Sequence, residues 1–174
     1  MRNLFFFLVT VTASATTLEK LTVEQMAQKA TSVVRGRVES CSSRFQGRNI
    51  YTFCRVRVSE QWKGTRQSVI EVAVPGGTTG GLTQTFSGAP SFTPNQEYVL
   101  FLWAGTSGVN QLIGLSQGAL NVHFDAKGEE LAQRDEIKAS LLSADGQEVE
   151  DQAVELRVGE LRKRIQSALK GATQ

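Results

Sequence analysis

The stretch at residues 32–64, SVVRGRVESCSSRFQGRNIYTFCRVRVSEQWKG, decides the fold. Apolar and polar side chains alternate along both of its halves, which is the period of a strand with one buried face. A candidate turn around Gly47 separates the two halves. The stretch therefore predicts two long antiparallel strands joined as a hairpin.

The two cysteines of the chain, Cys41 and Cys54, flank that turn. A hairpin brings them opposite one another, so the sequence predicts a structural disulfide that stabilises the fold by about 3 kcal/mol. Strict alternation would then place polar residues of one strand opposite apolar residues of the other. We therefore expect a single β-bulge near Gly36 or Ser40, which adds one residue to one of the two strands.

Further strands are expected after this hairpin, at 68–74, 97–103, 110–115 and 118–124, followed by a tight turn at 125–128. The segment 97–103, EYVLFLW, carries apolar residues on both faces, so we expect a central strand that is buried on both sides.

Helices are predicted on either side of the strands. Thr22 and Gln25 form a capping box, which predicts a short helix that ends near Ala30. The polar segment 135–153 is expected to be a connector with a helical turn around IKASLL, at 137–142. Beyond it, apolar residues at steps of three and four predict an amphipathic helix that packs on the strands. These apolar residues are Val158, Leu161, Ile165 and Leu169.

These elements predict a mainly β fold with flanking helices. The number and order of the strands favour a small OB-like antiparallel barrel of five to seven strands, with an N-terminal and a C-terminal helix. The expected units are a barrel with its leading helix at 16–134, and the connector with the C-terminal helix at 135–174.

Residues 1–15 have the layout of a secretory signal peptide. Arg2 precedes a nine-residue apolar run, and ASA at 13–15 is a small-x-small cleavage site. The run is too short for the roughly 20 residues that span a bilayer. We therefore expect cleavage near Ala15, export to the periplasm or the extracellular space, and a mature monomer that is not inserted in the membrane.

Charge is distributed unevenly along the chain. The whole chain has 19 basic and 17 acidic residues, yet residues 33–66 contain eight basic and two acidic ones. Arg35, Arg37, Arg55 and Arg57 share the outward face of the predicted hairpin. Tyr51 and Phe53 follow on that face, and exposed guanidinium groups and aromatic rings are typical of sites that bind polyanions. The alternative is a solvated face whose arginines pair with the acidic tail region.

The long segment at 75–95, PGGTTGGLTQTFSGAPSFTPN, is a second candidate site. It has no lysine after its glycines, which excludes a phosphate-binding P-loop. A loop of this length in a small domain is either functional or a pinned surface loop. The residues that we select in it as candidate binding residues are Gly76, Gly77, Gly80, Gly81, Phe86 and Phe92.

The motif GLSQG at 114–118 matches the G-x-S-x-G pattern that presents the nucleophile of many serine hydrolases. That pattern requires a helix after the serine, whereas the sequence after Gly118 alternates like a strand. An extended strand would also carry His123, the one histidine, about 20 Å from Ser116. No catalytic residue, cofactor or metal ligand is therefore assigned, and a hydrolase that uses Ser116 remains the less favoured alternative.

Several short motifs resemble those of netrin-like modules and tissue inhibitors of metalloproteinases. They are ATSVVRGRVES at 30–40, IYTFCRVRVSEQWKG at 50–64 and VIEVAVP at 69–75. The stretch 30–103 is also similar to uncharacterised exported bacterial proteins. The resemblance implies an OB-type barrel that binds another protein. It does not extend to zinc chelation, because those inhibitors begin with a cysteine and this mature chain would begin with Thr16. We thus expect an exported, non-enzymatic binding or accessory domain, with polyanion binding as the alternative.

Overall fold

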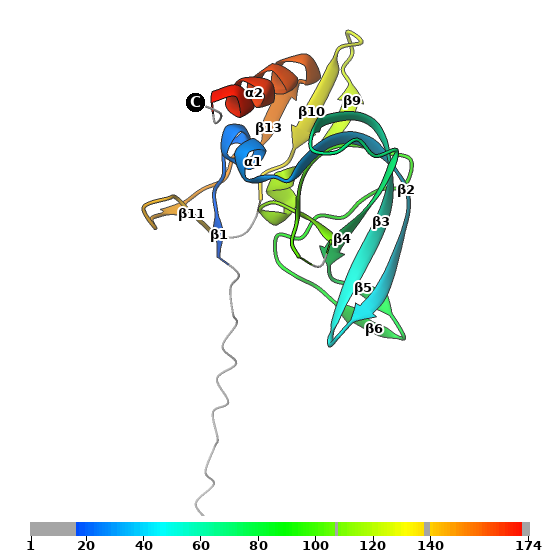
Figure 1. Cartoon of the computed structure of the whole chain (residues 1–174). Coiled ribbons are helices and arrows are strands. Elements are labelled where there is room, and N and C mark those ends of the chain that lie inside the picture. The colour runs from blue at the N-terminus through cyan, green and yellow to red at the C-terminus, as the bar shows by residue number, and fades with distance from the viewer. Residues whose placement is uncertain (1–16, 107, 138–139, 172–174) are drawn as a thin grey trace, which may run out of the picture.

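The computed structural model describes residues 17–106, 108–137 and 140–171. The predicted signal peptide at 1–15 lies outside these residues. In the part of the chain that is described, no helix combines the length and apolarity required to cross a bilayer. The fold is mainly β with two α-helices, as the sequence predicts (Figure 1).

The opening hairpin consists of two strands of 15 residues, β2 (Ser32–Gln46) and β3 (Asn49–Lys63). Cys41 lies directly opposite Cys54, and their sulfur atoms form the predicted disulfide. The predicted bulge is present next to Ser40, where the register skips one residue, but two more irregularities precede it. The expectation of a single bulge is therefore wrong, because the long hairpin needs several bends to leave the flat sheet and curve into a barrel.

Five strands close into a barrel in the order β2, β3, β4 (Val69–Pro75), β8 (Asn110–Leu112) and β7 (Glu97–Ala104), and β7 pairs back with β2. The β4–β8 pairing is parallel, whereas the sequence predicts a wholly antiparallel barrel. The chain passes through β7 before it enters β8, so β8 runs antiparallel to β7 and arrives beside β4 in the same direction.

Strand β7 is buried on both faces, as its sequence predicts. Tyr98, Leu100 and Leu102 point into the barrel and pack with the apolar residues of β2, β3 and β4. Val99 and Phe101 point outward into a second core, which contains both helices. One strand therefore joins the two cores of the molecule.

The second core lies between the barrel and a layer of further elements. These are α1 (Val23–Lys29), β9 (Ala119–Phe124), β10 (Glu130–Arg134), β13 (Val154–Arg157) and α2 (Val158–Gly171). Strands β9, β10 and β13 extend the sheet from β7. Helix α1 has the predicted capping box. Lys63, the last residue of β3, donates to the carbonyl oxygens of Ala27 and Gln28 and so caps the C-terminal end of α1.

Five short strands and one turn of 3-10 helix complete the fold of the described residues. They are β1 (Leu18–Glu19), β5 (Gly77–Thr79), β6 (Leu82–Gln84), β11 (Leu141–Leu142), β12 (Glu148–Val149) and η1 (Leu115–Gly118). The helical turn expected around 137–142 is wrong for its described part, because Leu141 and Leu142 pair with β1 and β12. Residues 138–139 lie outside the described residues.

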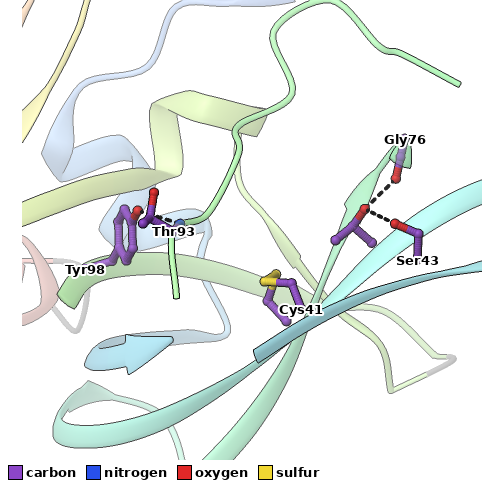
Figure 2. The surroundings of a disulfide bond; sticks show 7 residues. Cys41, Ser43, Gly76, Thr93 and Tyr98 are labelled. Atoms are coloured by element: carbon purple, nitrogen blue, oxygen red, sulfur yellow. Dashed lines mark hydrogen bonds between the residues drawn. A yellow bond between two sulfur atoms is a disulfide. The ribbon is translucent and has the colours of Figure 1, made fainter. Parts of the chain in front are cut away.

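The end of the β2–β3 hairpin projects beyond the barrel and carries the β5–β6 hairpin with it (Figure 1). The hydroxyl groups of Ser43 and Thr52 lie 2.9 Å apart, and Thr52 donates to the Gly76 carbonyl at 2.8 Å. Figure 2 shows this cluster close to the disulfide of Cys41. We call residues 43–52 and 76–86 together the hairpin end.

We expect the Cys41→Ala/Cys54→Ala variant to lose about 3 kcal/mol of unfolding free energy, because the unfolded chain regains the freedom of a short closed loop. Urea unfolding in non-reducing buffer measures the loss, and reduction of the wild-type protein should reproduce it. Hydrogen exchange at 43–52 should accelerate more than exchange in β7. An unchanged urea midpoint in both the variant and the reduced protein would contradict a structural role for the disulfide.

Candidate binding surfaces

Arg35 is the centre of a half-buried ion-pair cluster and is not available to a ligand. Its side chain is 11% exposed and contacts Glu130 at 2.5 Å, Glu97 at 2.9 Å and Glu60 at 3.3 Å. Arg162 of α2 pairs with Glu60 from the other side. The cluster therefore joins the barrel to β10 and to the C-terminal helix.

Burial and charge act in opposite directions on Glu97. Burial alone would raise the pKa of its carboxyl group, but the hydrogen bond and charge of Arg35 outweigh this, and the pKa lies below its ordinary value. The hydrogen bonds and charges of Glu130 and Glu97 raise the pKa of Arg35, although burial alone would lower it. Glu97 and Arg35 are therefore both charged at neutral pH.

The other three predicted arginines lie on the exposed side of the same face. Arg55 and Arg57 both donate to Glu39, at 2.8 and 2.6 Å, and these bonds hold the pKa of Glu39 below its ordinary value. Arg37 donates to the backbone carbonyl of Asn95. We call the surface of Arg35, Arg37, Arg55 and Arg57 the arginine face. Three of these arginines pair with acidic residues of the same protein, as the alternative interpretation expects. The acidic partners come from the barrel and β10, and not from the acidic tail region as predicted.

The two aromatic residues predicted beside the arginines are less accessible than expected. Phe53 is buried, because the Arg44 guanidinium lies 3.3 Å from the centre of its ring and covers it. Arg44 also pairs with Glu71 on β4. Tyr51 is half-buried and lies at an angle to Phe53, with 6.4 Å between the ring centres. The prediction of an open aromatic platform is therefore wrong for Phe53.

The segment 75–95 divides into two separate regions. Its first part forms the β5–β6 hairpin, with Gly80 and Gly81 in the turn at positive φ. Gly77 permits the close packing of this hairpin, because a β-carbon there would lie 2.3 Å from the Ser43 hydroxyl and 2.4 Å from that of Thr52. Gly77 therefore has a packing role, as does Gly76, where a β-carbon would lie 2.8 Å from the Gln84 carbonyl oxygen. The binding role of these glycines stays a prediction.

Three large apolar side chains are exposed on the hairpin end. Phe45 is 51% exposed and Leu82 is 60% exposed, and Phe86 is 36% exposed. The position of a β-carbon on Gly80 would lie 3.6 Å from the Phe45 ring, and one on Gly76 would lie 3.6 Å from Phe86. Two segments far apart in sequence thus place their apolar side chains on one projection of the molecule.

The second part of the segment, residues 88–93, forms one wall of a groove of about 770 Å³. Phe92 lies in this wall, and Ser116 and His123 line the same groove. Ser116 belongs to a turn of 3-10 helix that leads directly into β9. The α-helix that the G-x-S-x-G hydrolase pattern requires after its serine is therefore absent from the described residues at this point. Among the residues that the structure describes, no hydrogen bond joins Ser116 to His123.

Sequence analysis missed Phe45 and Leu82, and it did not predict that Asn121, His123 and Gln133 line one groove. Phe45 and Leu82 look like ordinary strand residues, and only the attachment of one hairpin to the other brings the β5–β6 turn beside Phe45 at Gly80. Comparison of the chain with protein-family models and with curated proteins finds no match.

We expect Arg35→Ala to cost about 3 kcal/mol of unfolding free energy at pH 7, because it leaves partly buried carboxylates without their cation. Arg57→Ala, on the same face but exposed, is the matched control and should change stability by less than about 0.5 kcal/mol. Urea unfolding measures both variants, and equal losses would contradict the assignment.

The cost of Arg35→Ala should also depend on pH in a defined direction. The pKa of Glu97 is lowered in the folded protein, so its ion pair contributes fully above its ordinary value of 4.5 and is lost as the pH falls through the lowered folded value. The difference between wild type and Arg35→Ala should therefore shrink on acidification below about pH 4.5.

Proposed function

We propose that the protein is an exported, non-enzymatic binding module whose partner is another protein that docks on the hairpin end. The observation that carries the proposal is the gathering of Phe45, Leu82 and Phe86 on one projection. Exposed apolar side chains that lie together are typical of interaction surfaces, whereas single ones are common on any protein. The Cys41–Cys54 disulfide supports export, because such bonds persist in oxidising compartments.

The charges around these side chains define the chemistry of the partner. The hairpin end contains Arg44 and Arg48 and has no aspartate or glutamate. Arg44 pairs with Glu71, whereas Arg48 in the turn is exposed and has no ion-pair partner among the described residues. A partner surface with an apolar ridge and adjacent carboxylates would complement both features.

The test is capture from the exported fraction of the source organism, with quantitative mass spectrometry as the readout. Immobilised wild-type protein should retain a partner that the Phe45→Ser/Leu82→Ser variant loses at least tenfold. Phe124→Ser is the matched control, because Phe124 is 67% exposed but lies at the end of β9, far from the hairpin end (Figure 1).

Two outcomes of this experiment would contradict the proposal. One is a partner retained equally by wild type and by the Phe45→Ser/Leu82→Ser variant. The other is a partner lost equally from this variant and from Phe124→Ser, which would indicate general apolar adhesion. Thermal unfolding of each variant shows that the loss does not come from misfolding.

Polyanion binding by the arginine face is the second candidate function. The observation that favours it is the exposure of Arg55 and Arg57, whose side chains are 60% and 66% exposed although both pair with Glu39. Glu39 neutralises part of this face, so we expect wild-type protein to elute from heparin at low salt. Glu39→Gln releases both guanidinium groups and should move elution to higher salt, and the additional Arg55→Ala/Arg57→Ala substitutions should reverse that shift. High-salt elution of wild type that Arg55→Ala/Arg57→Ala abolishes would favour the polyanion function instead.

A further inference from the structure

The groove beside residues 88–93 has a wall that is fixed in place. Ser116 donates its backbone N–H to the Gly88 carbonyl at 3.0 Å, and the Tyr98 hydroxyl accepts from the backbone of Thr93 at 3.2 Å. Phe92 packs edge-to-face on Tyr98, with 4.9 Å between the ring centres. These contacts make the groove a preformed one. Its volume of about 770 Å³ is within the usual range of small-molecule sites.

The floor of the groove comes from alternate residues of β9 and from the adjacent strand. Asn121 and His123 lie on one face of β9, and Gln133 of β10 is directly opposite Asn121 in the register. All three side chains are half-buried. They form a row of polar groups at the bottom of the groove.

These groups retain unused hydrogen-bonding capacity. Gln96 donates to the side-chain oxygen of Asn121 at 2.7 Å and to the carbonyl of Val122 at 2.8 Å. The Asn121 amide N–H groups and the Gln96 side-chain oxygen therefore remain available. The side chains of Ser116, His123 and Gln133 have no hydrogen-bond partner among the described residues. The groove thus presents both hydrogen-bond donors and hydrogen-bond acceptors to a ligand.

The groove is not suited to a peptide that binds by strand addition. In the described floor of the groove, Asn121 of β9 pairs with Tyr98 of β7 on one side and with Gln133 of β10 on the other, so the backbone there is already paired. Nor do its described charges favour an anion. Arg134 is held by the buried Asp151, while Asp135 and Glu136 are exposed carboxylates without an ion-pair partner in the described part of the chain.

We propose that this groove binds a neutral oligosaccharide. Each sugar hydroxyl both donates and accepts, which matches the mixed amide, imidazole and hydroxyl groups of the floor. The half-buried Phe92 ring offers an apolar surface for the C–H face of a sugar ring. The exposed carboxylates at the end of the groove can accept from further hydroxyl groups. This site is independent of the hairpin end and of the proposed protein partner.

The test is an NMR titration of the ¹⁵N-labelled protein with maltotriose, cellotriose and tri-N-acetylchitotriose, each to millimolar concentration. At least one trisaccharide should produce saturable shifts in the side-chain amides of Asn121 and Gln133 and in the His123 ring. Asn121→Ala, His123→Ala and Gln133→Ala should each weaken its binding about tenfold. Phe92→Leu, which keeps apolar packing but removes the ring face, should weaken it as well.

Gln166→Ala is the matched control for Gln133→Ala, because Gln166 is an exposed glutamine on α2 and does not line the groove. It should leave the affinity unchanged, as should Phe45→Ser/Leu82→Ser, which separates this site from the proposed protein-binding surface. The proposal is overturned if none of the three trisaccharides shifts the groove resonances. It is equally overturned if the shifts survive Asn121→Ala and His123→Ala, or if only heparin fragments or an uncharged peptide produce them.

Discussion

The burial of strand β7 on both faces is the constraint on which the rest of the molecule depends. Its even-numbered residues from Tyr98 to Leu102 fill the barrel, and Val99 and Phe101 fill the space beneath the helices. Because one strand serves both cores, the barrel and the helical layer cannot separate without exposing one face of β7. At about 25 cal/mol for each Å² of apolar surface, exposure of that face would cost a large part of the stability of a small domain. The barrel, the added strands β9, β10 and β13, and the helices therefore form one folding unit.

The arginines illustrate how an apparent binding face can serve the fold. Arg35 lies on the outward side of the barrel, but the strands added beyond β7 bring Glu130 over it, and α2 brings Arg162 to Glu60. A guanidinium group that is surrounded in this way orients several elements at once, because its donors have fixed directions. Arg57 lies on the adjacent strand β3, opposite Arg37, and pairs with Glu39 alone among the described residues. Its side chain stays 66% exposed. Residue type and strand face are the same, and the difference comes from Glu97 of β7 and from Glu130 of β10, both of which contact Arg35.

Local sequence carries most of the fold, because the capping box of α1, the hairpin, the disulfide and the two apolar faces of 97–103 are all patterns between near neighbours. The candidate sites are less predictable for a physical reason. Phe53 alternates with Cys54 and so belongs to the outward face, yet Arg44 from the partner strand covers it. The β5–β6 turn lies beside Phe45 at Gly80, and hydrogen bonds such as that from Thr52 to Gly76 hold this hairpin against β3. These contacts join segments whose relative position depends on the completed barrel, and no periodicity within either segment encodes them.

The hairpin end is held by interactions that contribute little to either core. None of its side chains belongs to the two described apolar clusters, although Ile50 is buried beneath the β5–β6 hairpin. Ordering a residue costs about 1–2 kcal/mol of backbone entropy, which core packing repays elsewhere in the protein. Here the opposing contributions are the disulfide at the base of the projection, the backbone pairing of the strands, and the hydrogen bonds among Ser43, Thr52 and Gly76. Part of this length also serves the barrel, because residues Tyr51 to Phe53 of β3 pair with Ala73 to Pro75 of β4. The projection therefore grows out of the barrel wall, and the disulfide lies where the two meet.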